Sequence, residues 1–226
     1  MNKFPIALEI GPKRRIFAQA LEWAGWCRSG KDEAAALNIL LTSATRYALV
    51  AGAAGFAFTV PTSIESFEVI ERVSGTATTD FGALSALLTS DLEPLAAGDI
   101  ERLASLLTTC WATFDDVFRR IPPEARQAQP ERGRSPHAMR LHLLEADLMH
   151  LSAFGPTFRP PDPSRVAEQE TTVREQIIAG LRAIPHGQVV APLHRYGFSW
   201  TPRFAVRRSA WHALDHAWEL LDRWNQ

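Results

Sequence analysis

Two of the seven histidines stand four positions apart near the C-terminus, in Ala210-Trp-His-Ala-Leu-Asp-His-Ala-Trp-Glu219. In a helix, His212 and His216 lie on neighbouring turns of one face, so both imidazoles can bind a single cation. The spacing alone is weak evidence, because most helical pairs of this kind are solvated or singly hydrogen-bonded histidines. A metal site therefore needs a further ligand from elsewhere in the chain.

His142 is the candidate for that third ligand. Taken singly, a histidine on an apolar stripe is more simply interpreted as a core residue bonded to one carbonyl. Three neutral imidazoles from two helices, however, are a ligand set that holds zinc with one coordination position open. Together the three histidines favour a metal site. Small and apolar residues share the helical stripe of His142 and leave room for a cavity: Ala138, Ala146, Met149 and Ala153.

Three charged residues occupy positions from which they could serve such a site. Glu145 and Glu219 each follow a candidate ligand by three residues, so either carboxylate could orient an imidazole, join the metal or act as a base. Arg208 precedes His212 by four residues and could bind an anionic substrate. Each has a plain alternative: a solvated acid for both glutamates, and a salt bridge to Glu219 or Asp215 for the arginine.

Residues 91–226 show the periodicity of amphipathic helices and predict a four-helix bundle. The last helix also carries a stripe of large apolar residues, Trp211, Leu214, Trp218 and Leu221, that is separate from its histidines. We expect this stripe to pack against the N-terminal part or another helix, so that the histidines line a cavity. Helices are expected at residues 99–120, 137–154 and 165–183 and from residue 203 onward, with Asp99 and Ser135 as caps, and the connector 184–202 is long enough to cover a functional opening.

Residues 1–90 predict a small mixed α/β domain. The alternation of polar and apolar residues on both sides of Gly11-Pro12 is typical of a hairpin. The expected elements, in order, are strands at 4–10 and 15–21, a turn over 23–30, a helix from Asp32 to about residue 51, and one or two strands within 56–75.

The composition is that of a globular protein, with 46% hydrophobic and 22% charged residues and a formal net charge of -1. It excludes disordered and fibrous classes. The charge balance disfavours nucleic acid, for which residues 119–140 hold the one arginine cluster. Cys27 and Cys110 suit neither a disulfide framework nor a thiolate metal site, which favours the cytoplasm. Polar interruptions in the N-terminal residues and in the window 37–60 lead us to expect no signal peptide and no membrane segment.

Two stretches carry a resemblance to a known family: His142-Leu-Leu-Glu-Ala-Asp147 and Arg207-Arg-Ser-Ala-Trp-His-Ala-Leu-Asp-His-Ala-Trp-Glu219. Residues 98–223 resemble the DinB-like superfamily, also called the YfiT-like metal-dependent hydrolases. The resemblance implies a mainly α fold, α+β overall, with a bundle of up-down-down-up connection. It also implies a metal on His142, His212 and His216. Residues 16–37 resemble the strand-strand-helix fold of HicB-type antitoxins.

Similar families include S-transferases that use bacillithiol, mycothiol or glutathione, in which a cation activates the thiol. We therefore expect a metal-dependent enzyme with a low-molecular-weight thiol cosubstrate and a small-molecule substrate. Zinc is the first expectation for the cation, with nickel or iron as alternatives. A hydrolase or a non-catalytic, metal- or small-molecule-binding stress protein are the alternative functions. A homodimer is an open expectation, whereas nucleic-acid and membrane partners are not expected.

Overall fold

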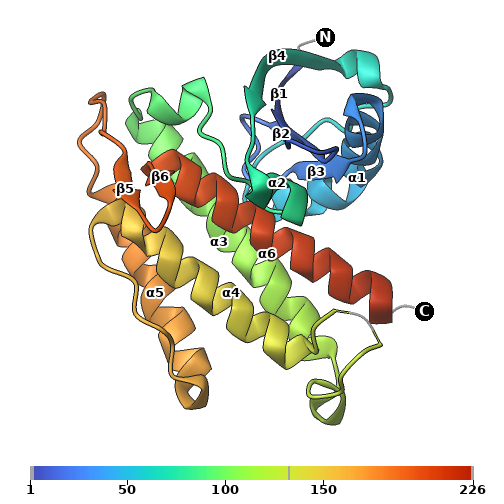
Figure 1. Ribbon diagram of the computed structural model, residues 1–226, viewed down its shortest axis with the longest axis vertical. Coiled ribbons are helices and arrows are strands. Elements are labelled where there is room, and N and C mark those ends of the chain that lie inside the picture. The colour runs from blue at the N-terminus through green and yellow to red at the C-terminus, as the bar shows by residue number, and fades with distance from the viewer. Residues whose placement is uncertain (1–2, 132, 225–226) are drawn as a thin grey trace.

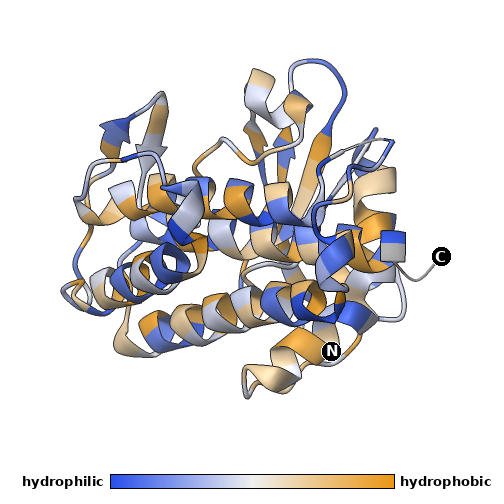
Figure 2. Ribbon diagram, turned by 90° about the horizontal axis from the view of Figure 1, so that it is seen from below, coloured by the Kyte–Doolittle hydropathy of each residue, from blue (hydrophilic) through white to orange (hydrophobic). Residues whose placement is uncertain are grey.

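The computed structural model describes residues 3–131 and 133–224, which form a mainly α-helical protein with a small mixed sheet. Figure 1 shows the sheet and helix α1 at one end of the molecule, beside four long helices. Hydrophobic and hydrophilic residues alternate around these helices (Figure 2), as expected for elements that bury one face.

The sheet has the strand order β3-β2-β1-β4. Strands β1 (Phe4–Ile10) and β2 (Ile16–Ala20) form the predicted antiparallel hairpin, and β4 (Phe67–Ser74) pairs parallel with β1. The expected turn over residues 23–30 is wrong in its second half, because Cys27–Gly30 forms strand β3 on the free side of β2. Its sequence, Cys-Arg-Ser-Gly, has low strand propensity, so the pairing with β2 determines the conformation.

Helix α1 (Glu33–Ala53) follows the predicted cap, since the Asp32 carboxylate accepts a hydrogen bond from the Ala35 backbone N–H at 2.8 Å. It is the crossover that lets β4 run parallel to β1. In the described chain, α1 is also the one helix long and apolar enough to cross a membrane by length and composition. Here its buried residues face the sheet, where Tyr47 stacks on Trp26 with ring centroids 5.6 Å apart.

The segment between the sheet and the bundle contains short helices: η1 (Ile64–Ser66), α2 (Ala77–Phe81) and η2 (Thr89–Leu92). One strand, β4, occupies the region in which one or two were expected. The segment is held by buried side chains, since Glu9 of β1 accepts a hydrogen bond from the Thr79 hydroxyl at 2.6 Å.

The four long helices are α3 (Ala97–Arg120), α4 (Pro136–His150), α5 (Val166–Arg182) and α6 (Pro202–Trp224). Ser135 caps α4 as predicted. The expectation for Asp99 is wrong by three residues: Ala96 occupies the cap, and the Asp99 carboxylate reaches back to the Ala96 N–H at 3.0 Å. The regular part of α4 ends at His150 and continues as a 3-10 turn, η4 (Leu151–Phe154). A short 3-10 turn, η5 (Pro163–Arg165), leads into α5.

Contacts between helix ends fix the directions of these helices. Glu101 near the start of α3 pairs with Arg182 at the end of α5, so these two are antiparallel. Gly180 near the end of α5 lies against the Phe154 ring, where an added Cβ would come within 2.8 Å. Helices α4 and α5 are therefore parallel. The connection between them runs back along the bundle (Figure 1).

Two further contacts orient α6. Arg203 at its start donates to the carbonyl of Pro94, just before α3, and Arg223 near its end donates to the carbonyl of Arg134, just before α4. Helices α3 and α6 therefore run in one direction, and α4 and α5 in the other.

The connector 184–202 contains a hairpin that the sequence analysis missed, formed by β5 (Leu193–Arg195) and β6 (Phe198–Trp200). Its two-residue turn is Tyr196-Gly197, with positive φ values of 54° and 77°. Glycine adopts such angles readily, and tyrosine is uncommon there. The hairpin carries the buried Trp200 onto η4 and α6, which anchors the connector.

One hydrophobic core cluster includes side chains of the sheet, of α1 and of all four long helices. The predicted boundary near residue 90 therefore divides the sequence at a point where the described halves share a core. Whether either half folds alone stays a prediction.

Candidate metal centre

The structure brings His142 of α4 together with His212 and His216 of α6. The Nε2 atom of His212 lies 3.2 Å from Nε2 of His142 and 3.1 Å from Nε2 of His216. One ligand nitrogen from each ring lies within 4.8 Å of the other two. The antiparallel course of α4 and α6 makes this possible, because it sets His142 opposite the two histidines that are one helical turn apart.

These separations suit a shared cation. Nitrogen–zinc bonds of ~2.0–2.1 Å in tetrahedral geometry place neighbouring nitrogens about 3.4 Å apart. The two shorter separations are close to that value. Each neutral imidazole nitrogen carries either a proton or a lone pair, so three nitrogens at one point cannot all be satisfied pairwise. A cation would be bound by all three lone pairs at once.

Glu219 holds one of the ligands in place. Its Oε2 lies 2.9 Å from Nδ1 of His216, and its other oxygen accepts a hydrogen bond from Arg223. A carboxylate at Nδ1 fixes the proton there and leaves the Nε2 lone pair directed at the other histidines. The hydrogen bonds from His216 and Arg223 lower the pKa of Glu219, which keeps the carboxylate charged. Glu219 was expected to orient an imidazole, join the metal or act as a base, and this geometry matches the first of these roles.

Burial keeps two of the ligands neutral. It lowers the pKa of His142 to about 4, with further lowering by the charge of Arg134. It also lowers the pKa of His212 well below its usual value. Neutral imidazole is the form that binds a metal.

A cavity of about 300 Å³ adjoins the histidines, between α4 and α6. His142 and His212 form part of its wall, and so do two of the predicted site residues, Glu145 and Arg208. Glu145 is exposed, which places its carboxylate on the solvent side. The remaining wall is mainly apolar: Ala83, Ala146, Met149, Phe158 and Trp211.

The alternative salt bridge for Arg208 is not formed. Glu219 pairs with Arg223, and Asp215 pairs with Arg28 at 2.5 Å. Instead the Arg208 guanidinium lies over the ring of Phe198, 4.3 Å from its centroid.

The large apolar stripe of α6 packs as expected. Trp211 meets Phe17 of β2 edge to face at 5.4 Å, and Trp218 lies under Arg28 of β3 at 4.0 Å. The stripe thus faces the N-terminal sheet, and the histidines face α4. The apolar stripe and the histidine stripe are separate in the sequence because one contacts the sheet and the other contacts α4.

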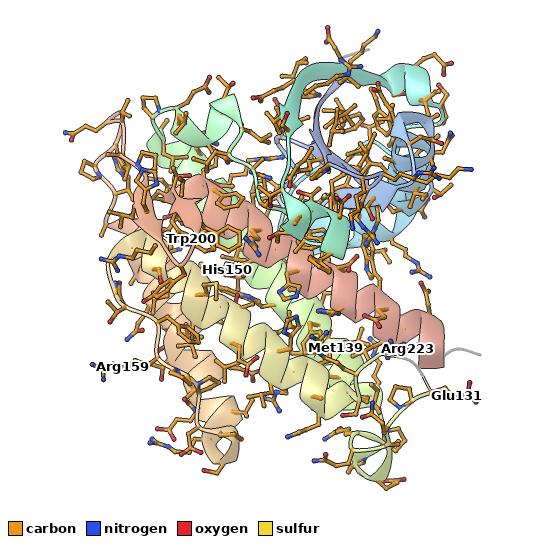
Figure 3. The ribbon with its side chains drawn as sticks, viewed as in Figure 1. Glu131, Met139, His150, Arg159, Trp200 and Arg223 are labelled. Carbon is orange, nitrogen blue, oxygen red and sulfur yellow. The ribbon has the colours of Figure 1, made fainter. Side chains whose placement is uncertain are left out.

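Sequence analysis missed a buried group on the cavity wall, His150 with Asp147 and Ser209. Asp147 Oδ1 accepts a hydrogen bond from the Ser209 hydroxyl at 2.5 Å and lies 3.3 Å from Nδ1 of His150. Figure 3 shows His150 on α4 beside Trp200 of the hairpin, and their ring centroids are 5.6 Å apart. The available signal was the spacing of Asp147 and His150, three apart and following His142 on the same helix.

Neither cysteine contributes to the site. Cys27 and Cys110 are both free and fully buried, and burial raises the pKa of each thiol well above its usual value. Buried thiols of this kind are unreactive.

No protein-family model, curated protein or solved structure matches this chain.

Proposed function

We propose that this chain is a metal-dependent enzyme in which His142, His212 and His216 hold one divalent cation. The convergence of three imidazole nitrogens within 4.8 Å, from two antiparallel helices, carries the proposal. Zinc is the first choice for the cation, with nickel or iron as alternatives, because imidazole suits all of them. The directions of the four long helices and the motif on α6 support a bundle of the DinB-like type.

The reaction we propose is transfer of a low-molecular-weight thiol to a small electrophile. A bound divalent cation stabilises a thiolate over the thiol, which makes the nucleophile abundant at neutral pH. The sulfur forms a bond to the electrophilic carbon, and the leaving group departs with its bonding electron pair. The apolar wall of the cavity holds the electrophile away from bulk water.

We propose His150, which lines the cavity together with His142 and His212, as the residue that receives the thiol proton. A carboxylate oxygen only accepts hydrogen bonds, so the 3.3 Å contact to Asp147 assigns the ring proton to Nδ1 and leaves Nε2 as the acceptor. Ser209 holds Asp147 in position for this contact. Glu145, on the solvent side of the cavity, remains a predicted alternative base.

A metal-dependent hydrolase is the second candidate, and the position of His150 on the cavity wall favours it as well. A base that accepts a proton from a thiol also accepts one from water, and His150 adjoins the proposed metal site through a shared cavity. The two functions differ in the nucleophile and not in the residues that serve it.

Metal content tests the first part of the proposal. The purified protein, dialysed against excess zinc and then against buffer, is expected to retain one equivalent by elemental analysis, and His216→Ala is expected to lose it. His186→Ala is the matched control, because His186 is an exposed histidine outside the cluster. Equal zinc in all three proteins would refute the site.

A thiol screen tests the second part. Glutathione, bacillithiol and mycothiol are each offered with a chlorinated aromatic electrophile, and release of chloride is measured. We expect turnover with one thiol that disappears in His216→Ala and persists in His186→Ala. Turnover of ester substrates without any thiol would establish the hydrolase instead, and zinc binding without either activity would establish a binding protein.

A further inference from the structure

Two residues that line the cavity, Arg208 and Trp211, each have a buried N–H group without an acceptor in the described part of the chain. Among the residues that the structure describes, Arg208 has no hydrogen-bond or ion-pair partner, and its Nη1 is buried. Nε1 of Trp211, which lines the same cavity, is likewise buried without a partner. Buried donors are almost always hydrogen-bonded, so each such exception needs an explanation.

Arg208 differs from other arginines that have a buried orphaned nitrogen. Arg28 and Arg174 also have one, but each pairs with a carboxylate, Arg28 with Asp215 at 2.5 Å and Arg174 with Asp115 at 2.7 Å. Arg203 has one too, and its guanidinium donates to the carbonyl of Pro94. Arg208 has only aromatic rings beneath it, those of Phe198, Trp200 and Phe204. These rings hold the guanidinium in place without supplying a negative charge. Burial and the charge of Arg207 lower its pKa to about 10, so Arg208 is still a cation at neutral pH.

The surroundings limit the charge that a ligand can bring. Glu9 acts on Arg208 electrostatically without pairing with it, and Glu145 lines the same cavity. At the Arg208 end of the cavity, a single guanidinium beside the charge of Glu9 favours a singly charged group over a dianion such as a phosphate monoester. A planar carboxylate carries a single charge and matches the guanidinium in a bidentate manner.

The rest of the wall limits the remainder of the ligand. The side chains that complete it are mostly apolar, and the volume of about 300 Å³ is at the small end of the ~300–1,000 Å³ typical of small-molecule pockets. Arg208 and His212 are one helical turn apart on α6, so a short molecule can reach both.

We propose that the cavity binds a small, largely apolar monocarboxylate, whose carboxylate accepts hydrogen bonds from Arg208 and Trp211 while its other end faces the histidines. The inference names the substrate class of the proposed metal enzyme and rests on that proposal for its chemistry. The carboxylate belongs to the electrophile or to the thiol, and the two sources are distinguishable.

Calorimetric titration of the zinc-loaded protein tests the inference, with benzoate as the probe and benzyl alcohol as its uncharged match. We expect benzoate to bind at least about tenfold more tightly, since hydrogen bonds to a charged group are worth that much or more. N-acetylcysteine and its amide form the second pair of probes, in which the molecule that carries the carboxylate is itself a thiol.

Arg208→Gln is expected to weaken the binding of benzoate, of N-acetylcysteine or of both by about tenfold or more. The binding of the two uncharged probes should not change. The probe that weakens identifies the source. Arg203→Gln is the matched control, a partly buried arginine on the same helix that donates to Pro94 outside this cavity. Trp211→Phe keeps the ring, removes the N–H and is expected to weaken the same probe about two- to tenfold, which preserves the test if Arg208→Gln does not fold.

The zinc content of each sample separates the two proposals. Bound zinc with no preference for either carboxylate, or with a preference that Arg208→Gln and Trp211→Phe leave intact, overturns the carboxylate inference alone. A preference that depends on Arg208 in protein that binds no zinc supports the inference while the proposed metal function fails.

Discussion

Arg207 and Arg208 are neighbours on α6, but only the first has hydrogen-bond and ion-pair partners in the described chain. Arg207 is almost fully buried and donates hydrogen bonds to both oxygens of Asp91, to Gln19 and to the carbonyl of Ala86. Arg208 lies in the cavity wall with no such partner in the described chain. Arg207 neutralises a buried carboxylate, whereas the charge of Arg208 is unpaired in the described chain and lowers stability. The proposed carboxylate ligand would supply the missing partner of Arg208.

Replacing Arg207 should have the largest effect on the free energy of unfolding. Arg207→Met leaves the Asp91 carboxylate buried without its cation, so we expect the free energy of unfolding to fall by about 3–5 kcal/mol. Urea unfolding followed by circular dichroism measures it. The double variant with Asp91→Leu should recover most of the loss, and a single variant within about 1 kcal/mol of wild type would contradict this role.

Metal binding should have the next largest effect. Zinc at a hundredfold excess over its dissociation constant should raise the free energy of unfolding by about 2.7 kcal/mol, because it binds the folded chain alone. Chelation should reverse the gain, and His212→Ala should abolish it. A zinc gain that survives in the variant would mean that zinc binds elsewhere.

The free energy of unfolding should depend on pH because His150 is neutral in the folded protein. Burial lowers its pKa, against the opposing effect of Asp147, so the fold holds the uncharged ring. The unfolded chain takes up this proton below pH ~6.5, so stability falls as pH drops from there towards the folded pKa, by at most about 1.4 kcal/mol per pH unit. His150→Gln should show a shallower loss between pH 6.5 and 5. Identical slopes would show that His150 is charged in the fold.

Ser209→Ala should cost about 1 kcal/mol, the typical value of one buried hydrogen bond, here to Asp147. Urea unfolding gives the stability, and the thiol-transfer rate should fall as well, since Asp147 would lose a group that positions it. A variant with unchanged stability and rate would remove Ser209 from the account.

Arg208→Met should have the smallest effect on stability, within about 1 kcal/mol of wild type and in the stabilising direction, because it removes an unpaired charge. This prediction sharpens the contrast with Arg207→Met, made with the same substitution one residue away. A loss comparable to that of Arg207→Met would mean that the fold itself satisfies Arg208.

The amphipathic helices and the hairpin were predictable because their patterns are local. The periodicity of α3, the Ser135-Pro136 start of α4 and the alternation around Gly11-Pro12 all appear within a few residues of sequence. Strand β3 was not predictable in this way, because it is a strand only through its pairing with β2. The β5–β6 hairpin was missed because its turn places a tyrosine, and not the usual asparagine or glycine, at positive φ.

The three histidines were predictable as a group because the helical spacing of His212 and His216 and the small neighbours of His142 are visible in the sequence. The surroundings were not. Ser209 as the partner of Asp147 depends on how α4 crosses α6, which spacing along the chain does not define. The pair of Glu219 and Arg223 is an exception, because these two residues lie four apart on α6 and their spacing is visible in the sequence.

The most direct test of the metal site is X-ray absorption at the zinc edge of the reconstituted protein. The account predicts three imidazole nitrogens at ~2.0–2.1 Å, with one position left for a light, exchangeable ligand. Fewer than three imidazoles, or sulfur scattering at ~2.3 Å in protein free of added thiol, would contradict it.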